Sequence, residues 1–154
     1  MIVADIDHFK HINDTYGHAE GDEVLRGVAQ ALKWAIHRPG DFVCRYGGEE
    51  FVLLLPGVDA EGAFIFADGL RQRIATMLLQ TANGKPLQLT LSLGGASHVP
   101  TTPEVSDALF LAADHALYDA KRAGRNRVAW AAALPPQDLD TALAPAPATM
   151  VPQR

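Results

Sequence analysis

The sequence has one cysteine, no long apolar run and no excess of positive charge, and each absence excludes a class of protein. Cys44 rules out an internal disulfide, and its apolar neighbours indicate that it packs rather than reacts. No run reaches the length of a membrane span, and the start lacks a signal-peptide pattern. The net charge of −5 argues against a nucleic-acid partner. We therefore expect a cytoplasmic protein that contacts neither membrane nor nucleic acid.

The two common nucleotide loops are also absent, because the chain contains neither G-x-x-x-x-G-K-[ST] nor G-x-G-x-x-G. Any nucleotide must therefore be held in another way. Positive charge is concentrated late in the chain, at Lys121, Arg122, Arg125 and Arg127. This cluster suits a phosphate group, although a solvated helix end, where cations are favoured, is the alternative interpretation.

The length and composition predict one globular domain with a tail. Of the 154 residues, 48% are hydrophobic and 20% are charged, close to globular averages. A domain of this size buries about 70% of its unfolded surface. We expect the domain to cover residues 1–131, and the Ala- and Pro-rich residues 132–154 to form a flexible tail.

The spacing of apolar residues and turn residues predicts a mixed α/β fold. The expected order is a buried strand at 1–7, a polar loop at 8–21, a helix from about 24 to 38, hairpin strands within 42–55, a helix from Asp59 to Asn83-Gly84, a half-exposed strand at 87–93, a helix at 105–124 and a short strand at 127–130. The first six strands and helices match a split βαβ arrangement, which is ferredoxin-like, resembles the palm of nucleotidyl cyclases, and has an antiparallel-containing sheet covered by helices.

The hairpin is the element around which we expect the site to form. Gly47 and Gly48 lie between two apolar runs, and a glycine pair there predicts a two-residue turn with positive φ angles. Glu49 and Glu50 would then leave the turn on opposite faces of the outgoing strand. A solvated acidic turn is the alternative, and the hairpin alone favours it slightly.

Carboxylates from the first strand strengthen the functional interpretation. Asp5 and Asp7 follow the apolar residues of that strand, which in a split βαβ sheet lies beside the hairpin that carries Glu49. Oxygen ligands from adjacent strands suit Mg²⁺, which completes its coordination with water and substrate phosphates. This arrangement predicts metal-assisted phosphoryl or nucleotidyl transfer.

Three separated blocks resemble the signature motifs of the GGDEF family, the diguanylate cyclases. Residues 5–22 match D-x-D-x-F-K-x-x-N-D-x-x-G-H-x-x-G-D, residues 45–51 match the Gly-Gly-Glu-Glu-Phe form of the hairpin motif, and Tyr118 to Asn126 match Y-x-A-K-x-x-G-R-N. The resemblance covers about residues 1–130. It implies an enzyme that joins two GTP molecules into cyclic di-GMP and releases diphosphate, and that works as a homodimer with one GTP in each half-site.

The resemblance also implies a role for individual residues. Catalysis would depend on Gly47, Gly48, Glu49 and Glu50, with Glu49 beside the 3′-hydroxyl. Mg²⁺, or alternatively Mn²⁺, would be held by Asp5, Glu49 and the Ile6 carbonyl. The triphosphate would contact the amides of His8 and Phe9 and the side chains of Lys10, Lys121 and Arg125. Asn13 and Asp22 would bind guanine, but Asp22 is equally well explained as an N-cap or first-turn carboxylate.

Arg38 and Asp41 have two interpretations. A cation and Pro39-Gly40 at this point are typical of a helix stop. Their spacing to Gly47 also resembles the R-x-x-D site at which cyclic di-GMP inhibits enzymes of the family. The further arginine that the family often supplies falls on Gly69 here, with Arg71 and Arg73 nearby.

The family usually begins a few tens of residues earlier, with a helix and a D-x-L-T-G-L-x-N-R-R segment. Because this sequence opens inside the first catalytic strand, we expect it to be a truncated form of a longer protein. The intact Asp5, Glu49 and Glu50 favour an enzyme. The missing segment favours the alternative, a non-catalytic module that binds GTP or cyclic di-GMP.

Overall fold

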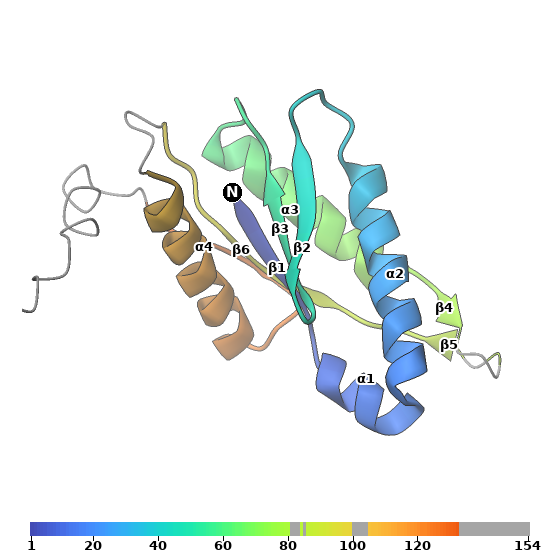
Figure 1. The fold of residues 1–154 in the computed structure, drawn as a ribbon. Helices are drawn as coiled ribbons and strands as arrows, with labels where there is room; N and C mark the ends of the chain where they lie inside the picture. The colour runs from blue at the N-terminus through green and yellow to red at the C-terminus, as the bar shows by residue number, and fades with distance from the viewer. Residues whose placement is uncertain (81–83, 85, 100–104, 133–154) are drawn as a thin grey trace, which may run out of the picture.

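A five-stranded sheet with the order β2-β3-β1-β6-β7 forms the centre of the molecule (Figure 1). The computed structural model describes residues 1–80, 84, 86–99 and 105–132. The sheet strands are β1 (Ile2–Ile6), β2 (Phe42–Gly47), β3 (Glu50–Leu54), β6 (Leu91–Gly95) and β7 (Val128–Trp130). Neighbouring strands are antiparallel except for the parallel pair β6 and β7. The predicted α/β class and the antiparallel-containing sheet are confirmed.

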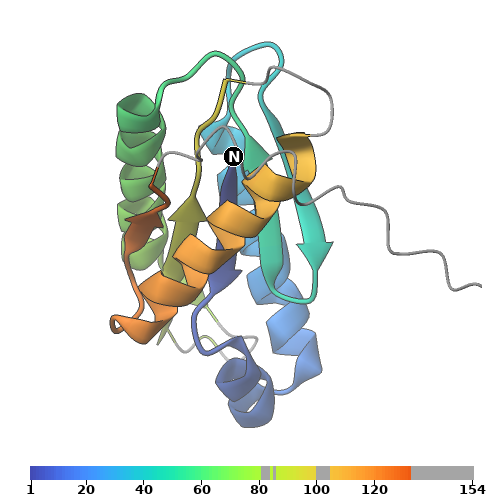
Figure 2. The same ribbon diagram turned by 90° about the vertical axis from the view of Figure 1, so that its left-hand side faces the viewer.

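Four helices and a small hairpin complete the described part of the chain. The helices are α1 (Phe9–Tyr16), α2 (His18–Ala35), α3 (Ala60–Thr76) and α4 (Val105–Arg122), and the hairpin is β4 (Leu79–Gln80) with β5 (Pro86–Leu87). In Figure 2, α4 lies across one face of the sheet, and α2 and α3 lie behind it. None of the helices in the described ranges is long and apolar enough to cross a membrane.

Alternation along β1 divides its side chains between two cores. Ile2, Ala4 and Ile6 belong to the larger core, which α2 and α3 cover, whereas Val3 belongs to the smaller core beneath α4. Each buried Val or Ile side chain contributes roughly 1.5–3 kcal/mol relative to exposure. Because side chains alternate with a period of two, Asp5 lies on the same face as Val3. The sequence of β1 therefore directs Asp5 toward α4.

Small residues on β6 let α4 approach that face. A Cβ atom at Gly94 would lie 2.0 Å from the backbone nitrogen of Leu117 and 2.2 Å from the carbonyl oxygen of Ala113. Only glycine leaves room for this contact between helix and strand backbones. The contact brings the end of α4, with its basic residues, close to the end of β1.

Several predicted boundaries were wrong. The residues expected to form a polar loop, 8–21, form α1 and the first turn of α2. Phe9 and Ile12 are buried at helical spacing, but the other residues of α1 are mostly polar and hide the pattern. Helix α2 ends at Ala35 rather than Arg38. The expected tail lies outside the described residues from residue 133 onward.

For α3, the predicted start is right and the predicted end is wrong. Asp59 caps α3 as expected, and its side chain accepts a hydrogen bond from the Gly62 amide at 2.8 Å. The helix ends at Thr76, well before Gly84, and Leu78 is exposed. The strand expected at 87–93 is right only in part. Gln88 is exposed between the buried Leu87 and Leu89, but β6 starts only at Leu91 and is buried along its whole length.

Candidate active site

The hairpin between β2 and β3 brings two glutamates to the end of β1. Its two-residue turn is Gly48 and Glu49, since Gly47 pairs with Glu50 across the strands. The prediction that Gly47 and Gly48 form the turn is therefore wrong by one residue, and of these two glycines only Gly48 has a positive φ, 46°. The irregularity between Arg45 and Gly47 causes this shift, because one extra residue bulges out of β2.

Asp5 faces the hairpin directly. It is 7% exposed, and Glu50 lies opposite it on β3. The Ile6 amide donates to the Glu49 carbonyl oxygen at 3.3 Å, which joins the turn to the end of β1. Glu49 lies in the turn rather than on the outgoing strand, so the two glutamates do not alternate as expected. Both nevertheless belong to the surroundings of Asp5.

The electrostatics of this cluster are unfavourable for the charge on Asp5. Burial raises the pKa of Asp5, and repulsion from Glu49 and Glu50 adds to the increase. Lys121 opposes these effects through a hydrogen bond and its charge, and its Nζ lies 2.8 Å from Asp5 Oδ2. The pKa of Asp5 remains raised overall, so Lys121 does not fully offset the burial of Asp5 and the repulsion from Glu49 and Glu50. The cluster therefore has negative charge that a further cation could neutralise.

Asp7 has a different role from the one predicted for it beside Asp5. Its Oδ1 accepts from the Ser92 hydroxyl at 2.6 Å. Its Oδ2 accepts from the Thr90 hydroxyl at 2.6 Å and from the Asn126 amide at 3.0 Å. Asp7 is only 4% exposed. Three donors occupy this buried carboxylate, so it holds β1, β6 and the segment after α4 together.

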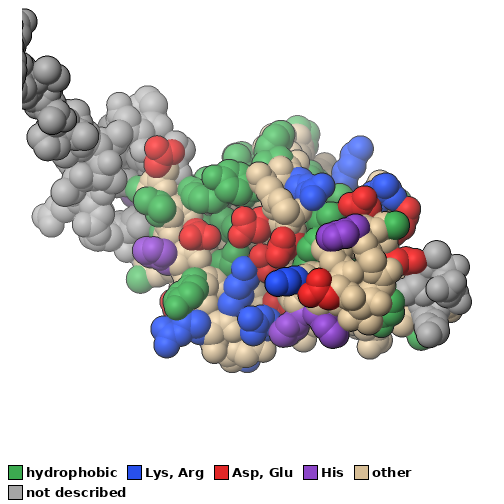
Figure 3. All heavy atoms as spheres, turned by 60° about the horizontal axis from the view of Figure 1, so that its bottom comes forward, with side chains coloured by type: hydrophobic (Ala, Val, Ile, Leu, Met, Phe, Trp, Pro, Cys, Tyr) green, Lys and Arg blue, Asp and Glu red, His purple; other side chains and the backbone are tan. Residues whose placement is uncertain are grey.

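The N-terminus of α1 follows directly after these carboxylates. His8 precedes the helix with a left-handed φ of 58°, Phe9 is buried, and Lys10 is exposed. The first amides of a helix have no partner within it, which makes them suitable donors for an anion. Figure 3 shows acidic, basic and histidine side chains gathered side by side on one face of the molecule. The predicted phosphate donors therefore lie next in sequence to the predicted metal ligands.

The two residues predicted to bind guanine come from neighbouring helices. Asn13 lies in α1 and Asp22 in α2, and the two helices pack together. Because α2 begins at His18, Asp22 lies beyond its first turn, and the interpretation as an N-cap or first-turn residue is wrong. A Cβ atom at Gly21 would lie 1.8 Å from Asn13 Oδ1, so the glycine leaves space for the amide. The Asp22 side chain is exposed.

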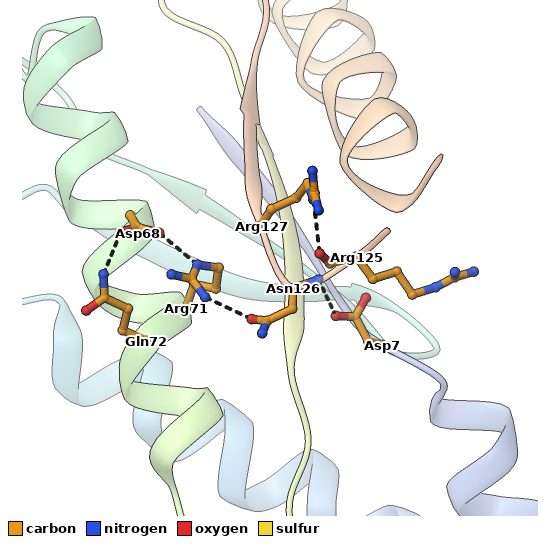
Figure 4. A network of polar contacts seen from close by, with 7 residues as sticks. All are labelled: Asp7, Asp68, Arg71, Gln72, Arg125, Asn126 and Arg127. Atoms are coloured by element: carbon orange, nitrogen blue, oxygen red, sulfur yellow. Dashed lines mark hydrogen bonds and ion pairs between the residues drawn. The ribbon is translucent and has the colours of Figure 1, made fainter. Parts of the chain in front are cut away.

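The basic residues in the last turn of α4 and just after it extend in two directions. Lys121 reaches back to Asp5, as described above. Arg125 and Asn126 both have left-handed φ angles, 60° and 45°. Figure 4 shows that the Arg125 side chain extends away from Arg71, while Asn126 lies between Arg71 and Asp7. The contact between Arg71 and Asn126 was not predicted, because these residues are 55 positions apart and no local pattern relates them.

Arg38 and Asp41 lie in the connection between α2 and β2. Together with Leu55, Val58 and Phe66 they line a cavity of about 270 Å³. Arg38 donates to the Pro56 carbonyl oxygen at 3.0 Å, so it fixes the far end of the hairpin rather than capping α2. Asp41 Oδ1 is buried and has no hydrogen-bond partner among the described residues.

A second cavity of about 300 Å³ adjoins the first, since both are lined by Ala35, His37 and Phe66. Gly69 and Arg73 of α3 line this second cavity, whereas Arg71 on the same helix turns toward Asn126. Of the two arginines near Gly69, only Arg73 therefore faces the region of Arg38 and Asp41.

Comparison with known proteins agrees with these features. The family described as "Diguanylate cyclase, GGDEF domain" matches residues 1–127. The uncharacterized protein YhcK of Bacillus subtilis is 45% identical over 128 residues, covering 83% of this chain and 35% of YhcK. Diguanylate cyclase DosC of Escherichia coli is 43% identical over 135 residues, covering 87% of this chain and 29% of DosC. The chain thus spans about a third of the length of these curated relatives.

Solved structures show the same fold. The GGDEF domain of DgcB from Caulobacter crescentus, determined in complex with c-di-GMP, has a TM-score of 0.77 and 37% identity, covering 84% of this chain and 75% of that one. The active GGEEF domain of a diguanylate cyclase from Vibrio cholerae has a TM-score of 0.75 and 37% identity, covering 86% of this chain and 82% of that one.

Proposed function

Because the chain belongs to the GGDEF family, we propose that it is a diguanylate cyclase that condenses two GTP molecules into cyclic di-GMP and two diphosphates. The observation that carries this proposal is the buried Asp5 beside Glu49 and Glu50, in front of the N-terminus of α1. A carboxylate cluster and helix amides together can bind a metal-bound triphosphate. Relatives named diguanylate cyclases support the same reaction.

The donor set fits a hard divalent cation. No three His, Cys, Asp or Glu side chains in the described ranges already converge as a metal site. A cation would therefore rely on Asp5, the hairpin carboxylate of Glu49, the Ile6 carbonyl and oxygen atoms of its ligand. Oxygen donors of this kind suit Mg²⁺, with Mn²⁺ as the alternative. When bound, the cation would neutralise charge on the phosphates and favour loss of the proton from the attacking hydroxyl.

Phosphate binding requires Lys121 to change partners. In the structure its ammonium group pairs with Asp5 at 2.8 Å. A cation bound at Asp5 would repel Lys121, which would then be free to contact the β- and γ-phosphates with Arg125 and Lys10. The amides of His8 and Phe9 would supply further donors. In our proposal Lys121 thus stabilises Asp5 until the substrate and its cation arrive.

Guanine recognition is assigned to Asn13 and Asp22. A carboxylate can accept from both guanine N1–H and the 2-amino group, and an amide can donate to and accept from the ring. Adenine has no donors at those positions, so the pair would favour GTP over ATP. The exposed side chain of Asp22 and the space at Gly21 support this assignment.

The reaction requires two chains. The 3′-oxygen of each GTP attacks the α-phosphorus of the other, a new P–O bond forms, and the bond to the diphosphate leaving group breaks. Glu49 would accept the proton of the hydroxyl, and Glu50 lies opposite Asp5 on β3. Because one site holds one GTP, two protomers have to face each other, and we propose a homodimer.

Product inhibition is proposed for the cavity at Arg38 and Asp41. The buried Oδ1 of Asp41, which lacks a partner in the described part of the chain, could accept from guanine N–H groups of cyclic di-GMP. Arg38 could pair with a phosphate or stack on the base. Arg73 and His37 in the adjoining cavity offer a replacement for the arginine that the family often has at the position of Gly69.

Incubation with GTP and Mg²⁺, followed by chromatography of the nucleotides, tests the proposal. We expect GTP to be converted into cyclic di-GMP and diphosphate, and ATP to be left unchanged. Glu49→Ala should form product at least about 100-fold more slowly under the same conditions, whereas the exposed control Glu23→Ala should behave like the wild type. Binding of GTP or cyclic di-GMP without turnover would instead support a non-catalytic binding module.

A further inference from the structure

The turn that carries Arg125 has an unfavourable backbone. Arg125 and Asn126 have φ angles of 60° and 45°, in the left-handed region that residues with a side chain seldom occupy. Asn tolerates this region better than Arg does. Such conformations persist where surrounding contacts determine them, so the contacts of this turn are important for where the Arg125 side chain lies.

Asn126 is held from two sides. Its backbone amide donates to Asp7 Oδ2 at 3.0 Å, and its side-chain Oδ1 accepts from Arg71 Nη1 at 2.9 Å. Asp7 belongs to the end of β1 and Arg71 to α3, so the turn after α4 is fixed between two separate parts of the fold (Figure 4).

Arg71 is itself held in place. Its Nε donates to Asp68 Oδ1 at 2.7 Å, and Gln72 Nε2 donates to Asp68 Oδ2 at 2.6 Å. The hydrogen bond from Arg71 is the main reason that the pKa of Asp68 is lowered. The Arg71 side chain is only 19% exposed. One edge of the guanidinium group is thus fixed on α3, and another nitrogen is directed at Asn126.

We propose that Arg71 is a positioning residue for Arg125, a role that rests on the proposed function because it requires Arg125 to contact the triphosphate of GTP. Arg71 holds Asn126, Asn126 with Asp7 fixes the left-handed turn, and the turn directs Arg125 to the side away from Arg71 (Figure 4). Arg71 itself does not touch the nucleotide.

The chain contains a matched control for the ion pair itself. Arg26 and Glu23 on α2 form a pair at the same i, i+3 spacing as Arg71 and Asp68, but both side chains are 67% exposed. No hydrogen bond from Arg26 to another segment is among those described. Arg26→Ala therefore removes an arginine and a helix-surface ion pair without disturbing the turn.

Calorimetric binding of GTP and GMP in Mg²⁺ tests the proposal. Arg71→Ala should weaken GTP binding by between about 10-fold and about 100-fold, the scale on which misplaced binding groups act. GMP, which lacks the β- and γ-phosphates, should bind as it does to the wild type, and Arg26→Ala should change neither. In an Arg125→Ala background, Arg71→Ala should cause no further loss, because the residue that it positions is gone.

Hydrogen exchange of the peptide that covers residues 123–127 provides a readout independent of nucleotide. Exchange should be faster in Arg71→Ala than in the wild type or Arg26→Ala, and Arg71→Lys should restore it only in part, since lysine cannot bond Asp68 and Asn126 with one planar group. A wild type that fails to bind GTP would refute the proposed function, and this inference with it. If the wild type binds GTP, three results would each refute the role of Arg71 while leaving the proposed function standing. These are unchanged hydrogen exchange in Arg71→Ala, unchanged GTP affinity in Arg71→Ala, and additive losses of affinity in the double variant.

Discussion

Asp5 and Asp7 are two residues apart on the same strand end and are both buried, but their surroundings are opposite. Asp7 accepts hydrogen bonds from two hydroxyl groups and one amide. Asp5 has one cation beside it and two carboxylates, and its pKa is raised. Asp7 is thus fully supplied with hydrogen-bond donors, whereas the charge of Asp5 is only partly compensated.

Asp41 belongs with Asp5 in this comparison. Its Oδ1 is buried without a partner among the described residues, and it lines a cavity. Buried polar atoms usually have a hydrogen-bond partner, so a buried oxygen without one is a candidate for binding a ligand. In the proposed enzyme, the two incompletely compensated carboxylates belong to the two ligand sites, and the fully compensated Asp7 belongs to the scaffold.

Asp5→Asn should separate activity from stability most strongly. We expect cyclic di-GMP synthesis to fall at least about 1,000-fold, as expected when a metal ligand and its charge are removed. The melting temperature should not fall. The pKa of Asp5 is higher in the folded than in the unfolded chain. The stability that protonated Asp5 contributes is therefore fully present below its pKa in the unfolded chain, and it is lost as the pH rises through its pKa in the folded chain. At neutral pH the neutral amide avoids this loss, and a large drop in melting temperature would contradict the comparison.

Glu49→Ala tests the hairpin side of the same cluster. It removes the carboxylate proposed to accept the proton and to hold the cation, so turnover should fall between about 100-fold and about 10,000-fold. GTP affinity should decrease less than turnover. The parallel variant Glu50→Gln shows whether the residue opposite Asp5 is equally important. Product formed by Glu49→Ala at the wild-type rate would show that the site is assigned wrongly.

Asp7→Asn should have the reverse effect of Asp5→Asn. An amide can accept through one atom only, and its NH₂ group would face the donors of Thr90, Ser92 or Asn126. We expect the free energy of unfolding to fall by about 3 kcal/mol, because a buried network loses partners. Urea unfolding measures the change. A variant as stable as the wild type would mean that the hydrogen bonds of Asp7 do not hold the fold together.

Asp22→Ala examines a carboxylate that is exposed rather than buried. The preference for GTP over ITP, which lacks the 2-amino group, should fall by about tenfold, because the acceptor for that group is lost. Stability should hardly change, since Asp22 lies beyond the first turn of α2. Competition binding measures the preference and thermal melting serves as its control; an intact preference would remove Asp22 from the guanine site.

Arg38→Ala should have the smallest effect on the initial rate. The residue lies in the α2–β2 connection and contacts Pro56, at a distance in sequence from the carboxylate cluster. We expect the initial rate to change less than about twofold and the inhibition constant for cyclic di-GMP to rise by about tenfold, since a charged partner of the phosphate is lost. Progress curves with added product measure both. An unchanged inhibition constant would assign Arg38 to the loop structure alone.

Much of the fold could be predicted from local patterns. The apolar first strand, the Gly-Gly hairpin, the Asp59 cap and the final strand all carry their signal in neighbouring residues, and the structure contains each of them. The predicted family follows from the same local motifs, and it is confirmed. The grouping of Asp5 with Glu49 could also be predicted, because the topology makes β1 and β3 neighbours.

What sequence could not reveal depends on distant partners. The alternation of Leu and polar residues at 87–93 predicted an exposed face, but Ser92 is buried in β6, where its hydroxyl group donates to Asp7. The contact of Arg71 with Asn126 likewise joins segments that no local pattern relates. The shift of the hairpin turn to Gly48 and Glu49 comes from a bulge that the Gly-Gly pair does not indicate.

The most direct test of the account is the effect of Mg²⁺ on GTP binding by the wild type and by Asp5→Asn, measured by calorimetry with Mg²⁺ and with EDTA. The wild type should bind GTP at least about tenfold more tightly with Mg²⁺, and Asp5→Asn should bind it equally in both conditions, since the carboxylate that links cation and protein is gone. An Asp5→Asn variant that keeps the full gain from Mg²⁺ would contradict the assignment of Asp5 as the residue on which the site depends.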